Sequence, residues 1–346
     1  MGIPTDSGAR LRQAFFRVLL VPLVAALTAG AAAAQDRTHV VIVVGLGGAA
    51  EFRESFHAEA SQIYTALTEQ HGLAAEDVTY LGEDVDVAPD VISEVSTRAN
   101  ILRVLGEISQ RADERDKVVV MLIGHGTEGP NGAQFNLPGP DLGPTDFELA
   151  MIAFPTQSLA LVHTGSASGG FVQPLAGPNR VVIAATRSAR ESNATEFGQF
   201  FAQAMSGGGS DLDHDNRVSL LEAFTFARQE VARYYDEQNE MLSEHAVLDD
   251  NGDGEGSLDA GPEGPDGLLA ATFTFGRGIA LEGVPADDPV LAGLLAERND
   301  IQRRIEELRV VRGALSEDEY LDRLEPLLVE LALKNREIEA AGGGGR

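Results

Sequence analysis

The sequence contains no cysteine among its 346 residues. Disulfides, thiolate metal sites and a cysteine nucleophile are therefore excluded. Basic residues are also few, because 26 Lys and Arg stand against 54 Asp and Glu, for a net charge of −28. Such a charge disfavours nucleic acid, whose phosphates are bound by clusters of Lys and Arg, and it disfavours anionic lipid. The content of 43% apolar and 23% charged residues is that of an ordinary globular protein.

Long apolar runs are scarce, and the most prominent one lies near the N-terminus. Residues 1–34 carry three arginines, then the apolar run 18–27, then a small-residue end at 30–34. This order is typical of a secretory signal peptide, cleaved here after Ala34, and the run is shorter than the roughly 20 residues of a membrane span. We therefore expect a periplasmic or secreted protein with no membrane span in its mature form.

The chain from residue 36 to residue 280 alternates short β-branched runs with helical stretches. Five runs predict strands, at 39–44, 77–81, 117–123, 158–163 and 180–185. Continuously apolar strands that alternate with helices predict an α/β sandwich, with a mostly parallel central sheet covered on both faces. A further run at 269–275 is expected to be the last strand of this domain.

Residues 286–340 predict a separate antiparallel α-hairpin. In its second helix the heptad positions are Leu321, Leu324, Leu328, Leu331, Asn335 and Ile338. Such a coiled-coil-like seam packs against the other helix or the main domain, or it joins two copies into a homodimer. Both alternatives stay open from the sequence.

Residues 211–222 follow the pattern of an EF-hand calcium loop. Side-chain oxygens recur at loop positions 1, 3, 5, 9 and 12, which are Asp211, Asp213, Asp215, Ser219 and Glu222. Position 7 is Arg217, which offers its main-chain carbonyl. Because Ca²⁺ takes six to eight oxygen ligands, with a bidentate Glu last, these residues predict a Ca²⁺ site. The departure from the pattern is Asn216, where glycine is usual.

Two weaker patterns stay open or are set aside. Residues 249–255 carry oxygens at positions 1, 3 and 5 with Gly254 at position 6, but Ala260 stands at position 12. This segment is an incomplete cation site or a simple turn. The G-x-G-x-x-A pattern at residues 45–50 has no acid about 20 residues further on, as dinucleotide binding requires, so we interpret it as a strand-to-helix turn.

The candidate catalytic residues stand where predicted strands end. His125 and Gly126 follow the third strand, and Ser166 follows the fourth. Ligands collect at the carboxyl ends of strands in open α/β sheets, so a base and a hydroxyl nucleophile can meet there. His163 lies inside the fourth strand and is expected to be a packed core residue.

This arrangement resembles the caspase/legumain-like cysteine peptidases. Their signature is a strand ending in His-Gly followed by a strand ending in C-x-S-G, and the resemblance covers roughly residues 38–280. It implies a caspase-like three-layer sandwich. It also implies that His125 is the acid or base, that Ser166 stands at the nucleophile position, and that main-chain groups at Gly126 and the nucleophile stabilise the oxyanion.

The departure from that family is Ser166, which replaces the cysteine. A thiol ionises readily beside a histidine, whereas a serine hydroxyl needs a tightly bonded and oriented base. The sequence therefore favours an exported, calcium-binding, peptidase-like protein without cysteine-peptidase activity, which binds or scaffolds a peptide or protein ligand. The alternative is an active endopeptidase with Ser166 as nucleophile and His125 as base.

Overall fold

The structure is a computed structural model that describes residues 37–207, 209–212, 217–261, 264–275 and 317–342, with scattered positions of 290–308. The predicted signal peptide, residues 1–34, lies outside the described residues. So do Asp213 and Asp215 of the predicted calcium loop. None of the described helices is both long and apolar enough to cross a membrane.

A seven-stranded sheet in the order β10-β8-β7-β4-β1-β2-β3 organises the domain. Its strands are β1 (Thr38–Val44), β2 (Val78–Gly82), β3 (Glu94–Val95), β4 (Lys117–Ile123), β7 (Ser158–His163), β8 (Arg180–Ala184) and β10 (Val247–Asp249). All neighbouring pairs are parallel except β10 and β8, which are antiparallel. The predicted parallel sheet is confirmed, with an antiparallel strand at one edge.

The sheet is buried on both faces, which explains why its strands are continuously apolar. Val40 and Ile42 of β1 belong to one hydrophobic core, while Val41 and Val43 belong to another. Since successive side chains of a strand point to opposite faces, each strand supplies both cores.

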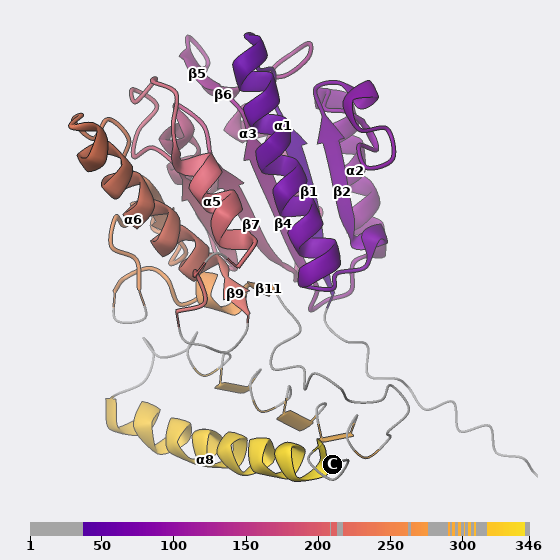
Figure 1. Cartoon of the computed structure of the whole chain (residues 1–346), viewed down its shortest axis with the longest axis vertical. Helices are drawn as coiled ribbons and strands as arrows, with labels where there is room; N and C mark the ends of the chain where they lie inside the picture. Colours follow the sequence, from indigo (N-terminus) through magenta and orange to yellow (C-terminus); the bar gives the residue numbers. More distant parts are fainter. Residues whose placement is uncertain are drawn as a thin grey trace, which may run out of the picture. The chain divides into compact units, whose positions relative to one another are not determined.

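Helices cover both faces, as Figure 1 shows, with α1, α5 and α6 in front of the sheet and α2 and α3 behind it. The front helices are α1 (Ala50–Thr65), α5 (Phe197–Met205) and α6 (Leu220–Gln238); the others are α2 (Arg98–Arg111), α3 (Pro144–Met151) and the single turn α4 (Val172–Leu175). The first core contains residues of α1, α5 and α6, and the second contains residues of α2, α3 and α4. The predicted three-layer α/β sandwich is therefore confirmed.

The prediction of one strand over 269–275 is wrong. Ala270–Thr272 form a 3₁₀ turn, and only Thr274–Phe275 form a strand, β11. This strand pairs with β9 (Val218–Ser219) in a separate two-stranded sheet. The antiparallel strand at one edge of the main sheet is β10, whose three residues are too few to show a period in the sequence.

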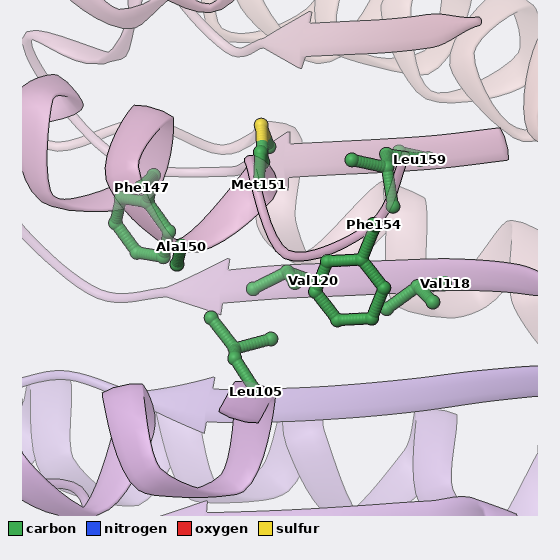
Figure 2. Close-up of a pocket in the computed structure, with 9 residues that line it drawn as sticks. Leu105, Val118, Val120, Phe147, Ala150, Met151, Phe154 and Leu159 are labelled. Atoms are coloured by element: carbon green, nitrogen blue, oxygen red, sulfur yellow. The ribbon is translucent and has the colours of Figure 1, made fainter. Parts of the chain in front are cut away.

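The second core contains a small apolar void, shown in Figure 2. Leu105 of α2, Phe147 of α3 and Val120 of β4 are among the residues that line it. Its volume is about 10 Å³, which is about the least that holds one water molecule. This void is thus a packing defect rather than a ligand site.

The C-terminal helices pack on each other. Ile301, Ile305 and Leu308 form a buried cluster with Leu327 of α8 (Glu317–Gly342). Two ion pairs join the same helices, Arg304–Glu330 at 3.2 Å and Lys334–Glu297 at 2.6 Å.

The residues predicted for the seam of α8 are buried only in part. Leu324 and Leu331 pack against the cluster and Ile338 is buried, but Leu321 is 51% exposed. Leu327, which was not assigned to the seam, is buried instead. The side chains of Leu328 and Asn335 lie outside the described residues. Dimerisation through these helices stays a prediction.

Candidate functional site

The two residues singled out as base and nucleophile lie at the ends of adjacent parallel strands. His125 follows β4 and Ser166 follows β7. In the register of these strands Leu122 stands opposite His163, so the segments that follow β4 and β7 leave the sheet at the same edge. The structure therefore brings His125 and Ser166 to one edge of the sheet, as the sequence predicted.

His125 lies against α1. Its ring meets Phe52 and Phe56 edge to face, at centroid distances of 4.5 and 4.9 Å. Burial lowers the pKa of His125, so the imidazole is neutral at pH 7. Within the part of the chain that the structure describes, no group forms a hydrogen bond with this imidazole. The orienting partner that a serine triad requires is therefore not found among those residues.

Ser166 is 3% exposed and is bonded to the main chain of Gly126. Its hydroxyl donates to the Gly126 carbonyl oxygen at 2.9 Å and accepts from the Gly126 N–H at 3.2 Å. The next residue, Ala167, has a left-handed φ of 56°, and its N–H donates to the Glu191 carbonyl at 2.8 Å. The single proton of the Ser166 hydroxyl is thus directed to a carbonyl oxygen.

Glycines are required where the two strand ends approach each other. A Cβ on Gly165 would overlap the carbonyl oxygen of Gly124, and one on Gly126 would overlap the carbonyl oxygen of Ser166. Only a residue without a side chain fits such a close approach of two backbones. The same approach places Ser166 Oγ between the N–H and the carbonyl of Gly126.

This geometry does not couple the nucleophile position to the base. Acyl transfer by serine needs a base that accepts the hydroxyl proton and free N–H groups that stabilise the oxyanion. Among the described contacts no hydrogen bond joins Ser166 to His125. The Gly126 N–H, which the family resemblance implies as an oxyanion donor, is taken by Ser166 Oγ.

The remaining polar residues of the motif are structural. Ser168 Oγ lies 3.1 Å from Thr186 Oγ1 and accepts from the Thr186 N–H at 3.1 Å. The Gly169 N–H donates to the same Thr186 hydroxyl at 2.9 Å. These bonds connect the segment after β7 with the segment after β8.

His163 is a core residue, as predicted. It is fully buried, and its ring meets Phe135 and Phe171 edge to face. Burial lowers its pKa to about 3, so the ring is neutral. Its Nδ1 accepts from the Gly165 N–H at 3.2 Å, which assigns the proton to Nε2 and fixes the turn before Ser166.

A cavity of about 250 Å³ opens beside His125, between α1, α5 and residues 194–196. Its wall contains the aromatic pair Phe52 and Phe56, and Ser166 does not line it. This volume is smaller than the roughly 300–1,000 Å³ of small-molecule sites and suits a single side chain.

The ionisable groups around this cavity, apart from His125, are the carboxylates of Glu51, Glu59 and Glu196. Burial raises the pKa of Glu59 to about 7; a hydrogen bond from the Ser55 hydroxyl, at 3.0 Å, opposes this rise and the charge of Glu196 adds to it. Burial, together with the charge of Glu240, also raises the pKa of Glu196. The cavity is thus an acidic hollow with an aromatic wall, which attracts a cation.

Buried polar groups hold one wall of this cavity in place. Glu244, which is 3% exposed, accepts from the N–H groups of Glu196 at 2.7 Å and Phe197 at 3.2 Å. Thr195 donates its hydroxyl proton to the Thr164 carbonyl at 2.7 Å. These bonds fix the start of α5 against the end of β7. None of the three acidic residues that line the cavity was predicted from the sequence.

The described part of the calcium loop is compatible with its predicted role. Ser219 caps the N-terminus of α6, and Glu222 accepts from the Ser219 N–H and hydroxyl, both at 2.8 Å. The other oxygen of Glu222 accepts from the Leu212 N–H at 2.9 Å, so this carboxylate faces back into the loop. Asp211 and Arg217 lie in the described part, on either side of the undescribed residues 213–216. Within the described residues no three His, Asp or Glu side chains are already arranged as metal ligands.

No family model matches the sequence. No curated protein matches it either. Among solved structures, the Drosophila initiator caspase Dronc is similar to the chain with 12% identity and a TM-score of 0.37, over 63% of this chain and 81% of the caspase chain.

Proposed function

We propose that this chain is an exported, peptidase-like protein of the caspase/legumain type that lacks peptidase activity and binds a peptide segment of a partner protein. The observation that carries the proposal is the pair of hydrogen bonds between Ser166 Oγ and Gly126. They direct the hydroxyl proton away from His125 and occupy the N–H that an oxyanion would need. A site with this geometry retains a binding cleft without a working nucleophile.

The acidic cavity suggests which peptide segment binds. Glu51, Glu59 and Glu196 line it together with two phenyl rings. A Lys or Arg side chain combines a cationic head with an apolar stem, so it complements both the carboxylates and the aromatic wall. We therefore expect the bound segment to place a basic side chain in this cavity.

Export and calcium binding belong to the same proposal. Residues 1–34 direct the chain out of the cytoplasm, to the periplasm or the medium. The loop 211–222 binds Ca²⁺ through Asp211, Asp213, Asp215, Ser219 and Glu222 with the carbonyl of Arg217. The support comes from Glu222, whose carboxylate faces the loop from the first turn of α6.

The test combines cleavage and binding. Mature protein is incubated with a diverse peptide mixture, with Ca²⁺ or with chelator, and the products are identified by mass spectrometry. Ser166→Ala and His125→Ala variants serve as controls. We expect no specific cleavage by any of them. Specific cleavage that is lost in both variants would overturn the proposal and establish a serine endopeptidase.

The binding arm uses fluorescent peptides that differ in one residue, Arg, Lys or Gln. Wild-type protein is expected to prefer the basic peptides. The double variant that combines Glu59→Gln and Glu196→Gln is expected to lose that preference. Arg53→Gln, on the exposed side of α1, is the matched control. Equal binding of all three peptides would contradict the cationic preference.

A further inference from the structure

The loop that follows β10 lies at the end of the sheet where the parallel strands begin. His125 lies at the other end, where they finish. In the antiparallel pair of β10 and β8, Asp249 stands opposite Val182, and the chain runs on from there toward the start of β8. The chain then turns and returns at Ser257, which exchanges two main-chain hydrogen bonds with Leu248, at 3.0 and 2.8 Å. This loop is therefore a separate feature from the candidate peptide site.

Four carboxylates gather here, and no basic side chain among the described residues pairs with them. Asp249, Asp250, Asp253 and Asp266 form no ion pair with any residue that the structure describes. In a chain with few basic residues, such a cluster needs another source of stabilisation.

Three of the four carboxylates are satisfied by hydrogen bonds. The exposed Asp253 accepts from the Glu255 N–H at 2.7 Å through one oxygen and from the Asn251 side-chain amide at 3.0 Å through the other. Asp250 accepts from the N–H groups of Gly267 and Ala270, both at 2.8 Å. Asp266, which is fully buried, accepts from the N–H groups of Asp250 at 3.0 Å and Asn251 at 3.2 Å. It also accepts from the Ser257 hydroxyl at 2.5 Å. These bonds tie the loop to residues 266–270.

Asp249 differs from these three. It is fully buried, and one oxygen, Oδ2, accepts from the Gly254 N–H at 2.7 Å. Its other oxygen, Oδ1, is buried without a hydrogen-bond partner. The Asp249 carboxylate also interacts with that of Asp253, which is exposed. A buried carboxylate oxygen with no donor and a second carboxylate beside it is costly unless a cation binds there.

We propose that Asp249 Oδ1, the Asp253 carboxylate and the Asn251 side-chain oxygen bind a divalent cation, Ca²⁺, in the loop 249–255. The candidate donors are all oxygens, which favours Ca²⁺ over metals that prefer nitrogen or sulfur. Two carboxylates and an amide leave the remaining positions to main-chain carbonyls and water. Because Ala260 stands where a bidentate Glu would complete the set, the affinity is expected to be modest, about 10⁻⁴–10⁻³ M.

The cation would stabilise the edge of the sheet. Asp249 ends β10, and its neighbours Asp250 and Asp266 join this strand to residues 266–270. Bound Ca²⁺ would relieve the repulsion between Asp249 and Asp253 and hold this junction closed. The effect is therefore expected in the stability of the protein rather than in the peptide site.

The test separates this site from loop 211–222. The Asp213→Asn variant removes a predicted ligand of that loop, and in this background calcium binding is measured by isothermal titration calorimetry. One site is expected to remain. Addition of Asp249→Asn or Asp253→Asn is expected to abolish it. Asp259→Asn, whose carboxylate is exposed and pairs with Arg228 at 2.6 Å, is expected to leave it unchanged.

Thermal unfolding supplies the second readout. Ca²⁺ is expected to raise the melting temperature of the parent variant but not of Asp249→Asn. In chelator Asp249→Asn is expected to melt no lower than the parent, because the amide keeps an acceptor for the Gly254 N–H and removes a buried charge. Calcium binding that persists in both Asp249→Asn and Asp253→Asn, or a parent variant that binds no Ca²⁺, would overturn the proposal. An equal loss of stability by Asp249→Asn with and without Ca²⁺ would do so as well.

Discussion

Ser166 Oγ is bonded to both main-chain groups of Gly126, donating to its carbonyl at 2.9 Å and accepting from its N–H at 3.2 Å. The residue at the nucleophile position thus blocks an N–H beside it. The proposed lack of peptidase activity therefore has two causes, and both arise from this contact. The hydroxyl is a weak nucleophile without a bonded base, and its position removes an oxyanion donor.

Ser166→Cys is expected to produce peptidase activity. A thiol is a weak donor and a weak acceptor, so its bonds to Gly126 are weaker and the N–H becomes free. A thiol also ionises more readily than the serine hydroxyl, and the thiolate is the stronger nucleophile. Specific cleavage after Lys or Arg, which is not expected in the wild type, should exceed the wild-type background at least about tenfold, which is about 1.4 kcal/mol in barrier height.

The double variant Ser166→Cys with His125→Ala is the control for that gain, and it should be inactive. If Ser166→Cys folds and binds basic peptides but cleaves none, the site lacks more than its nucleophile. In that case the explanation from the Gly126 contact is insufficient.

Gly165→Ala and Gly106→Ala are expected to change stability in opposite directions. A Cβ on Gly165 overlaps the Gly124 carbonyl oxygen, and a backbone clash of this kind destabilises by about 3 kcal/mol. A Cβ on Gly106, inside α2, meets nothing within 4 Å. Alanine there should stabilise the helix by about 1 kcal/mol. Urea unfolding of both variants measures the difference, and equal effects would contradict the close approach of the two strand ends.

The strand ends were predictable because their signals are local. Continuous apolar runs predict buried parallel strands, and the end of each run places His125 and Ser166 at one edge of the sheet. The glycines around them mark the close approach of the two backbones. The hydrogen bonds between Ser166 and Gly126 were not predictable, because they depend on atoms brought together from two separate strands.

The acidic cavity and the edge strand were missed for different reasons. Glu59 follows Phe52 and Phe56 at helical spacing, so the sequence holds a signal that it faces the core side of α1, but one carboxylate in a helix predicts no pocket. Glu196 joins it from a loop far along the chain. Strand β10 has only three residues, which is too short for a period.

Glu59→Gln is expected to stabilise the protein at high pH. The pKa of Glu59 is about 7 in the folded state, above its usual value near 4.5, because of burial. The folded state therefore binds this proton more tightly, and its stability increases as pH falls from 7 to about 4.5. Relative to wild type, Glu59→Gln should gain up to about 3 kcal/mol above pH 7, and the gain should vanish near pH 4.5.

Urea unfolding at pH 8, 6 and 4.5 measures this dependence, with Glu51→Gln, at the exposed rim of the cavity, as control. A gain of equal size at all three pH values would contradict the raised pKa of Glu59. The same titration bears on ligand binding, since a cation in the cavity favours ionised Glu59. The affinity for a basic peptide should therefore rise with pH and level off above pH 7.

His163 is expected to destabilise the protein in acid. Its pKa is about 3 in the folded state because of burial, whereas an unfolded histidine titrates near 6.5. Above pH 6.5 both states hold a neutral ring and His163 has no effect on the pH dependence. Between pH 6.5 and 3 only the unfolded state takes up this proton, so the free energy of unfolding should fall by about 1.4 kcal/mol per pH unit from this group.

His163→Phe separates this titration from the others. The variant keeps an aromatic ring between Phe135 and Phe171 but leaves the Gly165 N–H without its acceptor, which should cost about 1–3 kcal/mol at pH 7. As the pH falls from 7 to 5, uptake of this proton by the unfolded state lowers the free energy of unfolding of the wild type but not of His163→Phe. The free energies of unfolding of the two proteins should therefore converge. Nitrogen-15 NMR of the imidazole checks the cause directly, because the His163 ring should stay neutral, with its proton on Nε2, down to pH 4. A ring that titrates near pH 6.5, or a stability gap that does not change between pH 7 and 5, would show that burial does not hold this histidine neutral.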